Sequence, residues 1–125
     1  MTDPIIFHMC RAEEWERAVA AGSYRGSSQD AADGFIHFST AAQLAGSAAK
    51  HRTGQTGLLL LTADAAALGD ALRWEAARGG QLFPHLYGAL PVVAVTRVDP
   101  LPLGADGLHV IPAHAHPAGD DGERP

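Results

Sequence analysis

The chain has 125 residues, of which 46% are apolar and 18% charged, and its formal net charge is −5. This length suits one domain with one core, and the high apolar share excludes a disordered chain. The nine Lys and Arg residues are spread out, which argues against a nucleic-acid partner, because a phosphate-tracking surface needs clustered cations.

Cysteine count and hydropathy give the expected location. The single Cys10 excludes an internal disulfide. No apolar run reaches the length of a membrane span, and no charged-then-apolar leader of the ordinary signal-peptide form opens the chain. We therefore expect a cytoplasmic protein that works without a membrane.

The first part of the chain predicts one strand, one helix and a loop. Residues 4–10 form an apolar run of strand length, and residues 11–21 place apolar side chains at helical spacing before Gly22, a typical helix stop. Residues 24–26 predict a brief edge strand. Residues 27–34 are rich in Ser, Asp and Ala without a sustained period, and we interpret them as a loop.

A histidine lies in the middle of the most distinctive apolar stretch. Residues 34–40 read Gly-Phe-Ile-His-Phe-Ser-Thr and predict a strand, with His37 on the face of Phe35 and Ser39 and opposite to Ile36 and Phe38. Thr40 and Gln43 have the spacing of a reciprocal capping box, so a helix is expected to follow. The free N–H groups at a helix start favour an anion, which would then lie beside His37.

The second half of the chain predicts short strands. Residues 57–63 include four consecutive leucines, which indicates a central strand buried on both faces. Shorter strands are expected over residues 72–75, 93–98 and 108–111. With two main helices, over residues 11–21 and 40–51, this pattern predicts the α+β class.

Two further segments complete the predicted organisation. Residues 76–81 predict a turn, and His85 is expected in another turn that follows Pro84. From Pro112 onward the chain has no periodicity, so we expect a globular domain over residues 1–111 and a disordered tail over residues 112–125.

Three histidines, His8, His37 and His85, lie in or next to apolar segments. A buried imidazole needs a partner for each ring nitrogen, so three in one small domain exceed what core packing normally requires. A shared cleft explains them economically. Three separate structural histidines are the alternative interpretation.

Other chemistry could use the same residue types. Three His ligands and an open water position would form a catalytic zinc site, but the sequence lacks the short ligand spacing typical of such sites. A nucleophilic Ser39 would need a Gly-X-Ser-X-Gly context, which is absent. Glu75 is interpreted either as an exposed strand carboxylate or as one that fixes a ribose hydroxyl or an imidazole.

These residues form a series of motif blocks, which are IFHM at 6–9, DGFIHFST at 33–40, LRWE at 72–75, FPHLYG at 83–88 and LP at 90–91. Over residues 5–111 the series resembles the bacterial domain of unknown function 952 (DUF952) family, with GFIHFS and HLYG as its specific parts. That family is grouped with the ADP-ribosyltransferase-like fold. The resemblance therefore implies a small split antiparallel β-sheet domain that clamps NAD in a central cleft.

The resemblance also implies roles for single residues. His8 would face the nicotinamide-side ribose, and His37 the nicotinamide end, with a phosphate near the helix start. No carboxylate stands at the family fold's third position, where Glu75 is a candidate by residue type only. The implied catalytic residues are His8, His37 and His85, and the implied ligand-binding residues are Ser39, Thr40, Glu75 and Tyr87, with no metal.

The implied function is NAD-consuming ADP-ribosyl-type transfer. The alternative is a non-catalytic protein that binds a nucleotide or a small metabolite in the same cleft. The oligomeric state stays open.

Overall fold

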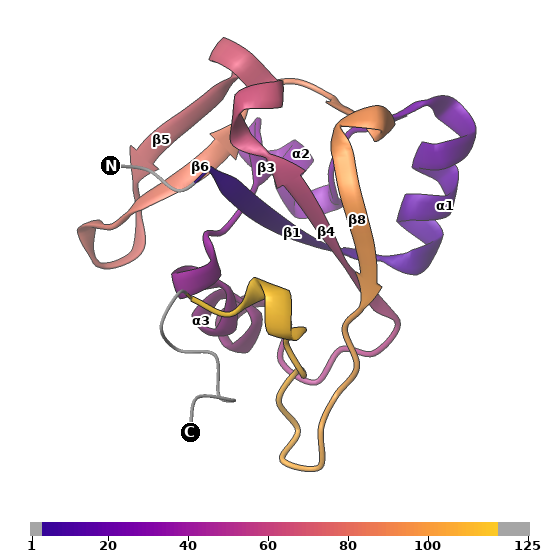
Figure 1. Cartoon of the computed structure of the whole chain (residues 1–125), viewed down its shortest axis with the longest axis vertical. Helices are drawn as coiled ribbons and strands as arrows, with labels where there is room; N and C mark the ends of the chain where they lie inside the picture. Colours follow the sequence, from indigo (N-terminus) through magenta and orange to yellow (C-terminus); the bar gives the residue numbers. More distant parts are fainter. Residues whose placement is uncertain (1–3, 118–125) are drawn as a thin grey trace.

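The computed structural model describes residues 4–117, except for the side chains of residues 28, 29 and 78, and has the α+β architecture that the sequence predicts, with antiparallel sheets and few helices. Within these residues the strands form sheets in the orders β1-β4-β8, β2-β7 and β3-β6-β5 (Figure 1). The helices are α1 (Ala12–Ala21), α2 (Ser28–Asp33) and α3 (Ala41–His51). The strands are β1 (Ile5–Arg11), β2 (Ser23–Tyr24), β3 (Ile36–His37), β4 (Leu58–Asp64), β5 (Leu72–Ala76), β6 (Leu82–Leu86), β7 (Leu90–Pro91) and β8 (Val95–Pro100).

The leucine-rich strand β4 lies at the centre of the β1-β4-β8 sheet, as predicted. Its side chains alternate between two apolar clusters: Leu58 and Leu60 pack in one, and Leu61 and Ala63 in the other. A strand buried on both faces needs no polar alternation, which explains the unbroken leucine run.

The helices α1 and α3 cover different faces of this sheet (Figure 1). Ala18 of α1 joins one apolar cluster, whereas Leu44 of α3 joins the other. The predicted signals for both helices are confirmed: Gly22 ends α1 at a φ of 87°, and Thr40 begins α3 through its capping box with Gln43.

The predicted loop over residues 27–34 is wrong, because these residues form the short helix α2. Ser27 accepts a hydrogen bond from the Asp30 N–H, and the Asp30 carboxylate accepts one from the Ser27 N–H at 2.7 Å. Gly34 ends the helix at a φ of 86°. A six-residue helix has fewer than two turns, so its apolar period cannot emerge from the sequence, although its caps can.

The predicted turn around His85 is also wrong. His85 lies in β6, which is the central strand of the β3-β6-β5 sheet. Pro84 is tolerated there because it still accepts a ladder hydrogen bond through its carbonyl, from the N–H of Phe38 at 3.0 Å. The long strand expected over residues 34–40 is shorter, since β3 contains only Ile36 and His37.

Two other strands differ from the prediction. β8 begins at Val95 because Val92–Ala94 forms a 3-10 turn. The expected strand over residues 108–111 is reduced to one isolated bridge between Leu103 and His109.

An isolated bridge joins the two three-stranded sheets. The Phe7 N–H donates to the Ser39 carbonyl at 2.8 Å, and the Ser39 N–H donates back to the Phe7 carbonyl at the same distance. This reciprocal pair fixes the end of β3 and the start of α3 against β1. Residues of both sheets can therefore line one cleft.

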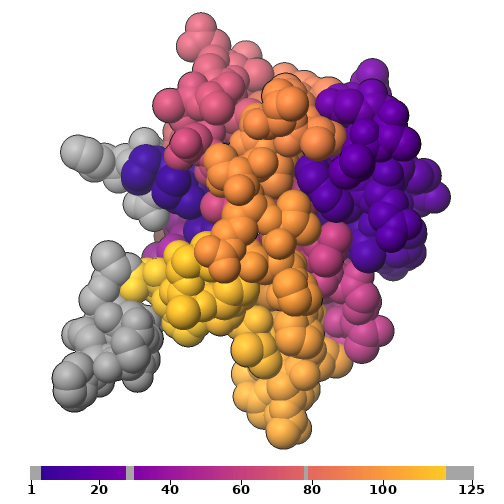
Figure 2. Space-filling model, turned by 45° about the vertical axis from the view of Figure 1, so that its right-hand side comes forward, coloured from indigo at the N-terminus to yellow at the C-terminus, as the bar shows by residue number. Residues whose placement is uncertain are grey.

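Residues 112–117 differ from the expected disordered tail. Ala113–Ala115 forms a 3-10 turn, and Ala115 is completely buried against the cluster that contains Phe7. His114 Nε2 lies 3.4 Å from the Asp99 carboxylate of β8, and Figure 2 shows this segment in yellow beside the orange strand. The remaining predicted tail, residues 118–125, lies outside the described residues. Across the described part of the chain, no helix is long and apolar enough to cross a membrane.

Candidate active site

A cleft of about 650 Å³ opens between β1, β3, α3 and β6. Its walls include His8, His37 and His85, so the fold brings the three predicted histidines to one cleft although they are far apart in the sequence. Their hydrogen bonds give each a different environment. The chemistry available to each histidine therefore differs.

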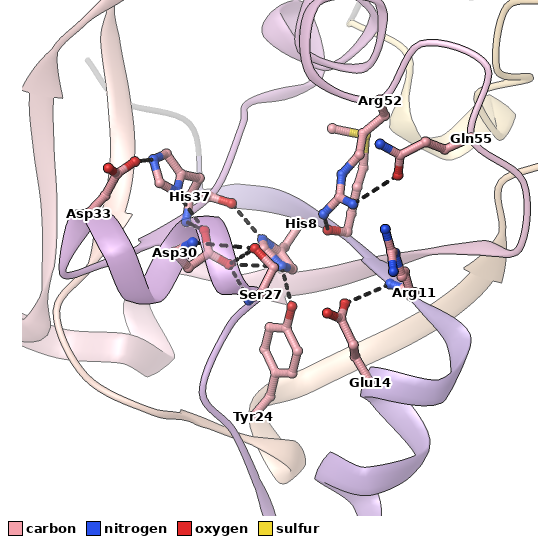
Figure 3. A network of polar contacts seen from close by, with 11 residues as sticks. His8, Arg11, Glu14, Tyr24, Ser27, Asp30, Asp33, His37, Arg52 and Gln55 are labelled. Carbon is pink, nitrogen blue, oxygen red and sulfur yellow. Dashed lines mark hydrogen bonds and ion pairs between the residues drawn. The ribbon is translucent and has the colours of Figure 1, made fainter.

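His8 is buried, and both of its ring nitrogens are bonded inside the protein (Figure 3). Nδ1 lies 2.6 Å from the His37 carbonyl oxygen, and Nε2 lies 2.7 Å from the Tyr24 hydroxyl. A carbonyl can only accept, so Nδ1 carries the proton and Nε2 accepts from Tyr24. Burial lowers the pKa of His8, which keeps it neutral. His8 thus connects β1, β2 and β3 and has no ring nitrogen left for a ligand.

His37 is half-exposed and lies between two carboxylates of α2 (Figure 3). Its Nδ1 is 2.5 Å from Asp30 Oδ1, and its Nε2 is 3.0 Å from Asp33 Oδ2. The hydrogen bond to Asp30 raises the pKa of His37 above its usual range. The two carboxylates therefore favour the protonated form of this histidine, which is held in the cleft wall.

Asp30 is the buried partner that holds His37. Burial acts against its charge, but hydrogen bonds from His37 and Ser27 lower its pKa to about 2. The same carboxylate accepts the backbone N–H of His37 at 3.1 Å. Asp30 therefore fixes both the side chain and the backbone of the histidine.

His85 has the arrangement most suited to proton transfer. Its Nδ1 lies 2.7 Å from Glu75 Oε1, and the Tyr87 hydroxyl donates to the same oxygen at 2.8 Å. These bonds lower the pKa of Glu75, with His85 as the larger cause, and the bond to Glu75 raises the pKa of Tyr87. Glu75 thus fixes an imidazole, which is one of the two roles expected for it.

The second nitrogen of His85 differs from those of His8 and His37. Nε2 makes no hydrogen bond with the side chains that the structure describes, and no buried nitrogen or oxygen of those side chains lacks a partner. His85 lines the cleft, and no described side chain occupies its Nε2. Phe35 stacks on the ring at 4.1 Å between centroids, and the His37 ring lies 5.7 Å away.

The other predicted ligand-binding residues have different positions. Ser39 lines the cleft and donates to Ser47 Oγ at 2.9 Å. Thr40 is buried and forms a capping box with Gln43. The backbone N–H of each residue donates to the side-chain oxygen of the other. Glu75 and Tyr87 lie outside the cleft lining, where Glu75 bonds to His85 and Tyr87 bonds to Glu75.

Sequence reasoning missed several residues that line the cleft, which are Arg11, Asp30, Asp33, Phe35, Lys50 and Arg52. The Ser27 to Asp30 capping spacing was a usable signal for α2. Lys50 and Arg52 are cations near a helix C-terminus, where cations are favoured by the helix dipole. Their positions in the sequence therefore did not indicate a role in a site. Within residues 4–117, no group of three or more His, Cys, Asp or Glu side chains is arranged to hold a metal ion.

The fold and the cleft define a small α+β domain with carboxylate-paired histidines along one concave surface. A family model described as "Protein of unknown function (DUF952)" matches residues 9–98, and the chain belongs to that family. No curated protein matches the chain.

Solved structures of protein CC0527 from Caulobacter crescentus resemble this chain. The crystal structure has 46% sequence identity and a TM-score of 0.86, over 89% of this chain and 97% of that one. The solution NMR structure has 47% identity and a TM-score of 0.76, over 85% and 91%. The α+β arrangement of antiparallel sheets is thus shared by an experimentally determined relative.

Proposed function

We propose that the cleft binds NAD or a related nucleotide and catalyses an ADP-ribosyl-type transfer, with His85 as the general base. The observation that carries this proposal is the Glu75–His85 pair, in which His85 lines the cleft and its Nε2 has no hydrogen bond with a described side chain. A general base needs a free lone pair within reach of the proton it removes and a partner that orients its ring. Among the three cleft histidines, His85 meets both conditions within the described part of the chain.

The reaction would proceed by substitution at the ribose. The oxygen of an acceptor hydroxyl forms a bond to the anomeric carbon while the bond to the nicotinamide nitrogen breaks, and neutral nicotinamide leaves with that electron pair. The acceptor proton passes to Nε2 of His85. Glu75 would stabilise the imidazolium that results, because its carboxylate already accepts from Nδ1.

The walls of the cleft suit a positively charged transition state. Asp30 and Asp33 both line the cleft beside His37. With His37 protonated, the two carboxylates and the imidazolium keep one net negative charge, which stabilises positive charge that develops on the ribose. They offer a substitute for the third-position carboxylate that the sequence lacks.

Cleft size and sheet arrangement agree with a nucleotide site. A volume of about 650 Å³ lies within the usual range for small-molecule sites. Two antiparallel three-stranded sheets joined by the Phe7–Ser39 bridge resemble the split sheet expected of an ADP-ribosyltransferase-like fold. We include that fold relationship in the proposal.

The test combines binding with product analysis. Calorimetric titration with NAD, ADP-ribose and AMP measures binding, and chromatography measures nicotinamide released from NAD. We expect His85→Gln to retain binding and to lose at least about a hundredfold in nicotinamide release. The control His114→Gln removes a histidine outside the cleft lining and should leave both unchanged. A folded wild type that binds none of the three ligands at millimolar concentration would refute the proposal.

A non-catalytic nucleotide or metabolite sensor is the second candidate. It is favoured by His8 and His37, whose ring nitrogens are all bonded within the protein. In that case the wild type would bind NAD without releasing nicotinamide, and His85→Gln would alter affinity alone.

A further inference from the structure

We infer that the end of the cleft formed by Arg11, Lys50 and Arg52 binds the phosphate groups of the ligand. This inference rests on the proposed function and names the part of the nucleotide held there. Figure 3 shows Arg52 and Gln55 on one side of His8, with His37 and Asp33 on the other. The cleft therefore has a cationic end and a separate end that contains His37 and His85.

Arg52 is the anchor of the cationic end. Nη2 donates to the Met9 carbonyl of β1 at 2.9 Å, and Nη1 donates to Gln55 Oε1 at 3.1 Å. A guanidinium has five N–H donors, so donors remain after these bonds. Arg52 lines the cleft and is only partly buried, so a ligand in the cleft can reach the side chain that carries these donors. The arginine is fixed in place and still able to bind an anion.

The positive charge at this end is not neutralised by the described residues. None of Arg11, Lys50 and Arg52 forms an ion pair with a carboxylate of residues 4–117. The Glu14 carboxylate, which also lines the cleft, accepts the backbone N–H of Arg11 at 3.0 Å. Three cations and one carboxylate leave this end with a net positive charge on a chain of net charge −5, which indicates an anionic ligand there.

A purely structural role accounts for only part of this arrangement. Lys50 in the last turn of α3 complements the helix dipole, and the bond from Arg52 to Met9 ties the helix end to β1. Neither role uses the remaining guanidinium donors. A phosphate oxygen pair matches the planar fork of an arginine, which makes a phosphate or diphosphate the fitting occupant.

This placement differs from the sequence expectation of a phosphate near Ser39 and Thr40. The Thr40 and Gln43 side chains occupy N–H groups at the start of α3, and Ser39 Oγ donates to Ser47. The start of α3 therefore has fewer donors for a ligand. Lys50 and Arg52 lie at its opposite end.

The experiment uses calorimetric titration with inorganic pyrophosphate and, separately, with NAD. We expect Arg52→Gln to weaken binding of both by about tenfold or more. The control Arg97→Gln removes an equal charge from β8, outside the cleft lining, where Arg97 is paired with Asp99, and it should leave both affinities unchanged. Thermal melts establish that each variant is folded. If Arg52→Gln does not fold, Lys50→Gln, which changes an exposed residue, tests the site in its place. Its affinity for pyrophosphate and for NAD is expected to fall by about threefold.

The outcomes separate this inference from the proposed function. NAD binding that is equal in the wild type and the folded Arg52→Gln variant, or in Lys50→Gln, overturns the phosphate site and leaves the nucleotide function standing. Pyrophosphate binding that depends on Arg52, without any NAD binding, supports the phosphate site and overturns the nucleotide function. A wild type that binds neither probe overturns both.

Discussion

Nδ1 of His85 lies 2.7 Å from Oε1 of Glu75, and this contact is set by the register of one hairpin. Strands β5 and β6 pair Arg73 with His85 and Glu75 with Phe83. Glu75 and His85 are therefore diagonal neighbours on one face, a spacing that long side chains can bridge. The pair belongs to a rigid element, which is the condition for reproducible proton transfer.

Replacement of Glu75 by Gln should lower the rate of nicotinamide release by about tenfold to a thousandfold. The amide keeps the shape of the side chain but removes the charge that stabilises an imidazolium and fixes the ring tautomer. The melting temperature should stay within a few degrees of the wild type, because Glu75 is half-exposed. Steady-state kinetics and a thermal melt check the two statements. An unchanged rate would show that the Glu75–His85 pair has no role in the reaction.

Tyr87→Phe should have a smaller effect that acts through Glu75. Loss of the hydroxyl removes one of the two hydrogen bonds that lower the pKa of this carboxylate, so that pKa should rise toward its ordinary value. Carbon-13 NMR titration of the Glu75 carboxyl measures the change directly. Tyr24→Phe serves as the control, since its hydroxyl bonds to His8 rather than to Glu75. A Glu75 titration that is unchanged in Tyr87→Phe would contradict the hydrogen-bond assignment.

The Asp30–His37 pair predicts a stability maximum in mildly acidic solution. The raised pKa of His37 stabilises the fold below its unfolded value of about 6.5, and this contribution is lost as pH rises through the folded pKa. The Asp30 pKa of about 2 gives a contribution that is present above the unfolded value of about 3.9 and lost as pH falls through the folded value. Both contributions are present between about pH 4 and 6.5.

Melting temperature as a function of pH tests this pair. Asp30→Asn should flatten the profile and destabilise the fold by about 2–4 kcal/mol, because the buried carboxylate accepts several hydrogen bonds. Asp70→Asn, on an exposed turn, is the matched control and should leave the profile intact. An Asp30→Asn profile that parallels the wild type would show that the pair contributes no pH dependence.

His8→Leu should destabilise the protein by about 2–4 kcal/mol, since the Tyr24 hydroxyl and the His37 carbonyl would lose their buried partner. Denaturant unfolding measures this free energy. The double variant His8→Leu with Tyr24→Phe should recover part of it, because the unpaired hydroxyl is then absent. A double variant that loses the sum of both single effects would contradict the proposed hydrogen bond.

Some features of the fold and site were accessible from the sequence for clear physical reasons. The leucines of β4, the cap at Thr40 and the stop at Gly22 are local signals, and each predicted its element correctly. The pairing of Glu75 with His85 could not be predicted from the sequence, because it depends on the register between two strands, which is a tertiary property. The same holds for Asp30, which reaches His37 only because α2 turns back beside β3.

The two ends of the cleft also differ in how far apart their partners lie along the chain. His85 and Glu75 are separated by 10 residues within one hairpin, whereas Arg52 and Met9 are separated by 43. Hairpins close within microseconds, but longer loops pay a larger closure entropy before their contacts form. We therefore expect the base and its carboxylate to be assembled early during folding. The arginine end is completed only when the rest of the domain has condensed around β1.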